Sequence, residues 1–171
     1  MTTTRKALAG LLLVSAGLAC ERPSPVRHSV TIAVPYEIDT LDPHAKDQTA
    51  YNAIAAHFYE SLVSTDGAMQ IHPCLATRWE NPDPLTWIFH LRPGVRFQNG
   101  AALSSADVVY TFQRLLHTPT LQISGYIQYV TEASALDART VRIRTARPVA
   151  VLLSKLRFVG IVPAGSSFSK S

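Results

Sequence analysis

Hydrophobic and polar side chains alternate most clearly in residues 85–91, which read LTWIFHL. Trp87, Phe89 and Leu91 occupy every second position of this stretch. Because successive side chains of a β-strand point to opposite faces of its sheet, these three side chains share one apolar face. We therefore predict a strand in which Trp87, Phe89 and Leu91 belong to the core and do not contact a ligand.

The same alternation predicts further strands. Residues 29–35 (SVTIAVP) are rich in β-branched side chains, and residues 129–148 fit two strands around a turn at Asp137-Ala138. After an RPG turn, residues 95–97 (VRF) are expected to continue as a short strand, and residues 157–163 (RFVGIVP) as a last one. Residues 69–84 contain several prolines and show no period, so we expect an irregular loop there.

Two stretches favour helices that flank the sheet. Ile54, Phe58 and Leu62 recur at helical spacing within residues 50–63, which predicts a helix with one face on the sheet. A short helix is expected directly after Pro148, since proline is favoured at the first helical position.

A third helix is predicted from Ser104 onward. Ser104 and Asp107 have the spacing of a capping box, in which each side chain bonds the backbone amide of the other residue. Val108, Phe112 and Leu115 then form one apolar stripe. Asp107 therefore has a structural role, which we favour over a catalytic one.

The first residues have the pattern of an export signal. Arg5 and Lys6 precede an apolar run over residues 7–19, which is shorter than the roughly 20 apolar residues that span a bilayer. We predict a signal peptide over residues 1–19. The run ends in GLAC, which resembles the lipobox of bacterial lipoproteins, so Cys20 is the predicted site of lipidation. The alternative is ordinary cleavage after Ala19 with a free cysteine. Residues 20–28 contain two prolines and are expected to form a tether.

Charge and metal-binding residue types give little further information about the function. Of the 16 Lys and Arg residues, two lie in the predicted signal peptide, which leaves 14 against 12 Asp and Glu. This near balance, without a dense basic run, argues against nucleic acid as a partner. The six histidines are scattered, so no metal site or cofactor is predicted. Cys74 is interpreted as a small buried residue with a free thiol.

Four blocks of sequence resemble one family, the bacterial extracellular solute-binding proteins of family 5, which serve peptide and nickel ABC importers. The blocks are LDPH (41–44), FYESLV (58–63), LATRWE (75–80) and WIFHLRPGVRFQNGAALSSADVVYTFQRLL (87–116). The resemblance implies an α/β fold, a mixed sheet with flanking helices, forming part of the first lobe of a type II-like periplasmic-binding-protein fold. We assign this lobe to residues 29–163 and a polar tail outside the family pattern to residues 164–171. The resemblance also implies that the chain is truncated before a second lobe.

By resemblance, the function is the capture of oligopeptides or related small solutes, nickel included, without covalent chemistry. The partners would be the solute and a membrane complex of ABC permease and ATPase. The protein would be a monomer, held by its lipid in the periplasm or at the cell surface. In resembling proteins the ligand is contacted by the loop before the first helix and by the last strands of the lobe. The corresponding residues here are Asp47, Tyr51, Asn52 and Arg157. Arg157 is the candidate partner for a carboxylate.

Two other readings stay open. A truncated remnant without function would share the same sequence pattern. An exported hydrolase would need a nucleophile with its base, or two opposed carboxylates. The serines of SSAD at 104–107 are explained by helix capping, and the chain has no Gly-x-Ser-x-Gly elbow.

Overall fold

The computed structural model describes Ala33 and residues 38–168. The predicted signal peptide, the tether with Cys20, and all but Ala33 of the predicted strand at 29–35 lie outside the described residues. From residue 38 onward the described chain belongs to one compact unit. Within the described part, no helix combines the length and the apolar character needed to cross a bilayer.

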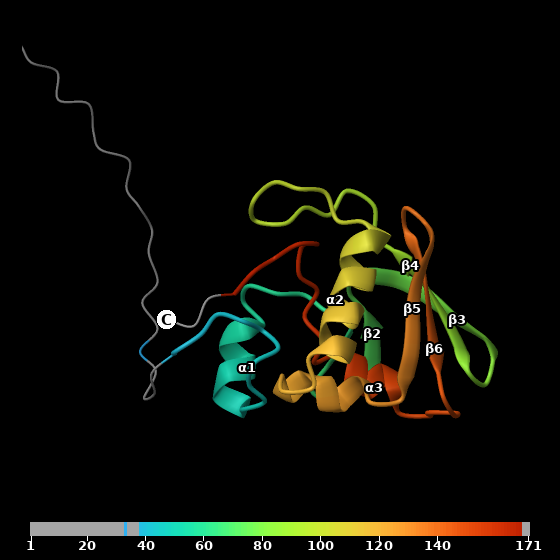
Figure 1. The fold of residues 1–171 in the computed structure, drawn as a ribbon, viewed down its shortest axis with the longest axis horizontal. Coiled ribbons are helices and arrows are strands. Elements are labelled where there is room, and N and C mark those ends of the chain that lie inside the picture. Colours follow the sequence, from blue (N-terminus) through green and yellow to red (C-terminus); the bar gives the residue numbers. More distant parts are fainter. Residues whose placement is uncertain (1–32, 34–37, 169–171) are drawn as a thin grey trace, which may run out of the picture. The chain divides into compact units, whose positions relative to one another are not determined.

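The centre of the fold is a four-stranded sheet (Figure 1). Its strand order is β3 (Ala76–Asp83), β4 (Thr86–Leu91), β6 (Thr140–Thr145) and β5 (Val130–Asp137). A separate hairpin pairs β1 (Val63–Thr65) with β2 (Ile71–Pro73). The expected α/β class with flanking helices is confirmed. Among the described strands every pairing is antiparallel, where we had expected a mixed sheet.

The helix α2 (Ser105–His117) packs on β5 and β6 and closes the core from one side (Figure 1). Its predicted stripe is buried, and Val108 and Phe112 are fully enclosed. The opposing sheet face supplies Phe89, which is fully buried, and Leu91, while Trp87 packs on the core at its margin. The prediction that the alternating face of residues 85–91 forms core is therefore confirmed for Phe89 and Leu91.

The capping box of α2 forms as predicted. The Asp107 carboxylate accepts bonds from the Ser104 amide and hydroxyl, each at 2.8 Å. Its second oxygen accepts the Ala164 amide at 2.8 Å. Asp107 thus fixes the start of α2 and holds the C-terminal segment against it.

The first helix is shorter than its apolar spacing predicts. The helix α1 covers Thr49–Ala55, and the chain turns before β1. Leu62 is buried as predicted, together with Val63, but they enter the core from an extended segment and a strand, whereas Phe58, which was expected on the same face, is exposed. The prediction of a helix through residue 63 was wrong. A helix and a strand can both place Leu62 and Val63 in the same core, so the apolar pattern did not distinguish them.

The stretch 69–84 is not an irregular loop, since it contains β2 and β3. Trp79 of β3 lies opposite Phe89 of β4, so pairing with the most regular strand overrides the local prolines. Pro82 is tolerated because β3 is an edge strand with a register shift between Glu80 and Asp83.

Three other expectations needed correction. Residues 95–97 form only an isolated bridge, from Arg96 to Ala102. The helix α3 covers Leu152–Leu156 and begins four residues after Pro148. Residues 157–163 form no strand, although the Ile161 amide donates to the Glu60 carbonyl at 2.8 Å. A 3-10 helix, η1 (Gln122–Ile127), was not predicted.

Candidate functional site

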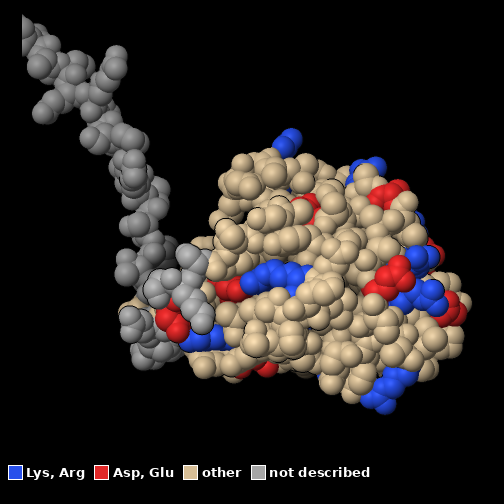
Figure 2. Space-filling model, in the orientation of Figure 1, with Lys and Arg blue, Asp and Glu red and all other residues tan. Residues whose placement is uncertain are grey.

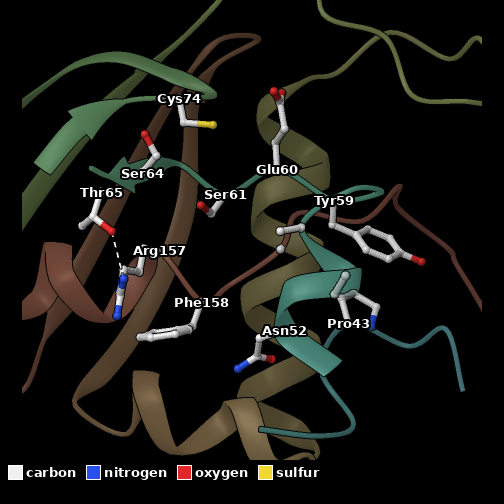
Figure 3. A pocket seen from close by; sticks show the side chains of 13 residues that line it. Pro43, Asn52, Tyr59, Glu60, Ser61, Ser64, Thr65, Cys74, Arg157 and Phe158 are labelled. Carbon is white, nitrogen blue, oxygen red and sulfur yellow. Dashed lines mark hydrogen bonds between the residues drawn. The ribbon is translucent and has the colours of Figure 1, made fainter. Parts of the chain in front are cut away.

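A pocket of about 390 Å³ lies between α1, β1 and the segment that follows α3 (Figure 3). Asn52 lines it from α1, Thr65 from β1, and Arg157 and Phe158 from the residues after α3. Three segments that are distant in sequence therefore bring an amide, a hydroxyl, a cation and an aromatic ring to one cavity.

Arg157 is the strongest polar feature of this pocket. Its Nη1 donates to the Thr65 hydroxyl at 2.8 Å, and its guanidinium lies 4.2 Å from the centre of the Phe158 ring. The Nε atom is buried and has no hydrogen-bond partner within the described part of the chain. Because the Nε atom is enclosed by protein, a molecule in the pocket cannot reach it, and any donor that Arg157 offers to such a molecule comes from the terminal nitrogens of the guanidinium.

Asn52 lies at the same pocket and is held by Asp47. The Asn52 amide donates to Asp47 Oδ1 at 3.0 Å, and the Tyr126 hydroxyl donates to Asp47 Oδ2 at 2.8 Å. Burial, with the bond to Asp47 next, raises the pKa of Tyr126. Asp47 itself is exposed and does not line the pocket. Its place is beside the pocket, where it orients Asn52.

Tyr51 is placed away from the pocket. It is buried, and its hydroxyl lies 2.7 Å from both the Thr40 and the Asp42 carbonyl oxygens. Burial is the main cause that raises its pKa to about 12. Of the four residues predicted to bind solute, the structure brings Asn52 and Arg157 to one cavity, places Asp47 against Asn52, and uses Tyr51 to hold residues 40–42.

Sequence reasoning missed other residues of the pocket. Phe158 and Thr65 hold Arg157, and no pattern along the chain joins β1 to the segment after α3. Cys74 was predicted to be simply buried, yet it is half-buried and lines the pocket. Burial, followed by the nearby Glu60 carboxylate, raises the pKa of its thiol, so the thiol is protonated at neutral pH.

The LDPH stretch forms a buried cluster that we call the clasp: Asp42, His44 and Arg114. Arg114 donates to both carboxylate oxygens of Asp42, at 3.0 and 2.5 Å, and also to His44 Nδ1. The opposite ring nitrogen of His44 lies 2.8 Å from the Gly160 carbonyl. Since Arg114 can only donate, Nδ1 is the acceptor and Nε2 carries the proton that goes to Gly160. The clasp joins the first turn, α2 and the C-terminal segment.

The described residues include no group of three or more His, Cys, Asp or Glu side chains that could hold a metal ion. The face shown in Figure 2 carries scattered charges, with acidic and basic side chains often side by side. Such a face lacks the dense positive stripe that nucleic-acid binding requires.

Comparison with known proteins decides the family. The family model for the bacterial extracellular solute-binding proteins, family 5 (Middle) matches residues 70–170. The chain belongs to this family. The match extends into the segment 164–171, which we had expected to lie outside the family pattern. Within that segment the Ser166 carbonyl accepts from Tyr110 at 2.7 Å, so the segment packs on α2.

Two curated family-5 relatives show how much of such a protein is present here. The periplasmic oligopeptide-binding protein of Salmonella typhimurium is 29% identical over 127 residues, 71% of this chain and 23% of the relative. The glutathione-binding protein of Salmonella typhi is 31% identical over 156 residues, 90% of this chain and 30% of the relative. The chain thus spans less than a third of the length of either relative.

The fold agrees with solved family-5 structures. An oligopeptide-binding protein from Burkholderia pseudomallei superposes with a TM-score of 0.69 and 27% identity, over 75% of this chain and 29% of that one. The longest block of the family pattern, residues 87–116, contributes β4 and α2 to the scaffold, and its residues 95–99 and Leu103 line a second pocket of about 700 Å³. Its Arg92 pairs with Glu60 at 3.0 Å, and its Arg96 donates to the Gly100 carbonyl at 2.8 Å.

Proposed function

We propose that this chain is part of the substrate-binding component of an ABC importer and that it captures oligopeptides or related small solutes. The observation that carries the proposal is membership of family 5, with relatives named for binding oligopeptides and glutathione, itself a short peptide. Binding without covalent chemistry is the role we assign, in place of an enzymatic one. An assignment to nickel complexes rests on family resemblance alone.

The pocket beside Arg157 is the proposed contact point for the solute. A guanidinium can hold a carboxylate with two parallel charge-assisted hydrogen bonds. Arg157 uses Nη1 on Thr65, and its Nη2 makes no hydrogen bond within the described structure, so Nη2 is left to donate to such a group. A hydrogen bond that involves a charged group contributes about 1.5–3 kcal/mol, which is a roughly tenfold or larger effect on affinity.

Asn52 complements this cation with a neutral amide that can both donate and accept. Its fixed bond to Asp47 orients the amide before a solute arrives, which lowers the entropic cost of binding. We propose that Asn52 forms hydrogen bonds with the backbone of a peptide-like solute, while Arg157 binds its carboxylate. Asp47 acts through Asn52, and Tyr51 acts by holding the turn at residues 40–42.

The rest of the proposed role concerns location and partners. We propose that residues 1–19 are a signal peptide, that Cys20 carries a lipid anchor, and that residues 29–163 belong to the first lobe. The protein would act as a monomer in the periplasm or at the cell surface and deliver solute to an ABC permease with its ATPase. Since the chain spans 23% and 30% of the two relatives, most contacts to a solute would come from sequence beyond these 171 residues.

The proposal is tested by a chimera. Residues 29–163 would replace the matching segment of the S. typhimurium oligopeptide-binding protein, and the purified chimera would be mixed with a di- to pentapeptide library. We expect retained peptides to be found by mass spectrometry after gel filtration. The same chimera with Arg157→Gln should retain few of them, whereas Arg139→Gln, at an exposed turn, should behave like the parent chimera. A correctly folded chimera that retains no peptide would refute the assignment.

A further inference from the structure

Met69 is the only methionine of the sequence beyond Met1. It lies in the turn between β1 and β2, is 57% exposed, and has a φ angle of 61°. This left-handed backbone conformation favours glycine, so the turn carries a long side chain at a conformational cost. The Asp66 carboxylate fixes the turn, because one of its oxygens accepts the Ala68 and Gln70 amides at 2.9 Å each. A hydrogen-bonded turn therefore presents the Met69 thioether at the surface.

The Met69 thioether lies against the cation of the proposed solute pocket. Arg157 Nη1 donates to Met69 Sδ at 3.9 Å and to the Thr65 hydroxyl at 2.8 Å, and Figure 3 shows the second of these bonds. Met69 does not line the pocket, so it acts on the pocket through Arg157. A thioether sulfur is a weak acceptor, and a carboxylate in the pocket can displace it from Nη1.

We propose that Met69 is a site of oxidative modification, and that its sulfoxide binds Arg157 and lowers the affinity of the pocket for carboxylates. The oxidant would be a peroxide or a hypohalous acid. This inference rests on the proposed function in one respect, namely that a solute carboxylate binds at Arg157.

The reaction is the transfer of one oxygen atom to sulfur. With hydrogen peroxide, an electron pair of the sulfur forms the new S–O bond and the O–O bond breaks. The departing hydroxide takes the proton of the transferred oxygen and leaves as water. The sulfide is oxidised and the peroxide is reduced, and methionine sulfoxide reductases reverse the change.

Oxidation changes which acceptor occupies Arg157. The sulfur already lies within reach of Nη1, and the rotatable bonds of the methionine side chain allow an oxygen on it to reach the same nitrogen. Because Nε is enclosed by protein, a carboxylate can form two parallel bonds with Arg157 only through Nη1 and Nη2. Thr65 accepts one Nη1 hydrogen, and the sulfoxide oxygen would accept the other. The solute is then left with Nη2 and loses one of two charge-assisted hydrogen bonds.

The first measurement needs no solute. The full chain is treated with hydrogen peroxide and then with dithiothreitol, which reverses sulfenic acids and disulfides at the cysteines and leaves the sulfoxide in place. Mass spectrometry of a digest should find one added oxygen at Met69, formed at a rate within roughly threefold of that of free N-acetylmethionine amide, because the side chain is exposed.

NMR of the same samples tests the contact with Arg157. The signal of the Arg157 Nε–H group, assigned by its loss in Arg157→Gln, should shift when Met69 is oxidised. Treatment with methionine sulfoxide reductases A and B should restore it. In Met69→Leu, which keeps both cysteines, peroxide followed by dithiothreitol should leave the signal unchanged.

The second measurement is peptide binding by the chimera, which contains Met69 within residues 29–163. The oxidised chimera should bind tripeptides with a free carboxylate about three- to tenfold more weakly than the reduced chimera, because one of two charge-assisted bonds is lost. Met69→Gln, which places a carbonyl acceptor near the sulfoxide position, should show a similar loss without oxidant. The affinity of the Met69→Leu chimera should not respond to peroxide.

Three results would each overturn the inference: a Met69 thioether that resists peroxide, an Arg157 signal that does not respond to the sulfoxide, or an unchanged affinity of the chimera that carries the sulfoxide. A reduced chimera that binds no peptide would instead refute the proposed function, and with it the effect on affinity. In that case the mass and NMR measurements on the full chain still decide whether the sulfoxide forms and binds Arg157.

Discussion

Replacement of Phe89 by alanine should remove a large part of the stability of the domain. Phe89 has no exposed surface, lies opposite Trp79 and Val141 in the sheet, and stacks on Trp87 with ring centres 6.5 Å apart. Phe→Ala substitutions in cores cost about 3–5 kcal/mol, and more where the surroundings cannot collapse into the cavity. The walls here are strands and a packed helix, so we expect about 4 kcal/mol, compared with a typical total of about 5–15 kcal/mol.

The measurement is urea unfolding followed by the fluorescence of Trp79 and Trp87. With a slope of about 2 kcal/mol per molar urea, the midpoint of Phe89→Ala should fall by roughly 2 M while the slope is unchanged. Ile88→Ala is the matched control, since Ile88 is the next residue, faces the other side of the sheet and is only half-buried. It should cost about 1 kcal/mol. If Phe89→Ala lost no more than Ile88→Ala, the assignment of this face to the core would be refuted.

Three further predictions concern other parts of the chain. The pKa of His44 is lowered from 6.5 to about 4. Between these two values the unfolded chain binds a proton at His44 and the folded chain does not. The free energy of unfolding should therefore fall by about 3 kcal/mol from pH 7 to pH 4 in denaturant titrations, and this loss should be absent in His44→Gln. Asp107→Ala removes the acceptor of the Ser104 and Ala164 amides and should cost about 2 kcal/mol in the same assay. Cells fed a labelled fatty acid should label the wild-type chain and not Cys20→Ala; equal labelling of both would contradict lipidation.

The regular parts of the fold could be predicted because local pattern and tertiary packing agree there. The strand with Phe89 alternates cleanly, and the helix from Ser105 combines a cap with an apolar stripe. The hairpin at residues 130–145 has a turn of suitable residues between two alternating runs. In each case the period of the sequence matches the geometry that buries the apolar side chains.

Other parts could not be predicted because neighbours distant in sequence decide them. The strand β3 contains Pro82 and lacks clean alternation, yet it pairs along β4. Residues 58–63 fit a helical period, but the chain turns there to start β1. The site follows the same rule. Asn52 and Arg157 were chosen by family resemblance. Phe158 could not be chosen from the sequence, because it lines the pocket only once α3 brings the following segment beside β1.

The proposed contact between Arg157 and a solute carboxylate is tested most directly by calorimetry on the chimera with matched peptides. Tripeptides with a free C-terminal carboxylate would be compared with the same tripeptides amidated, on the parent chimera and on Arg157→Gln. We predict that amidation weakens binding to the parent at least about tenfold and that it has little effect on Arg157→Gln, because one charge-assisted contact is lost in either case. The 171-residue chain alone should bind neither peptide measurably, since it spans less than a third of its relatives. Equal affinity of the parent for both peptides, or tight binding by the chain alone, would contradict the account.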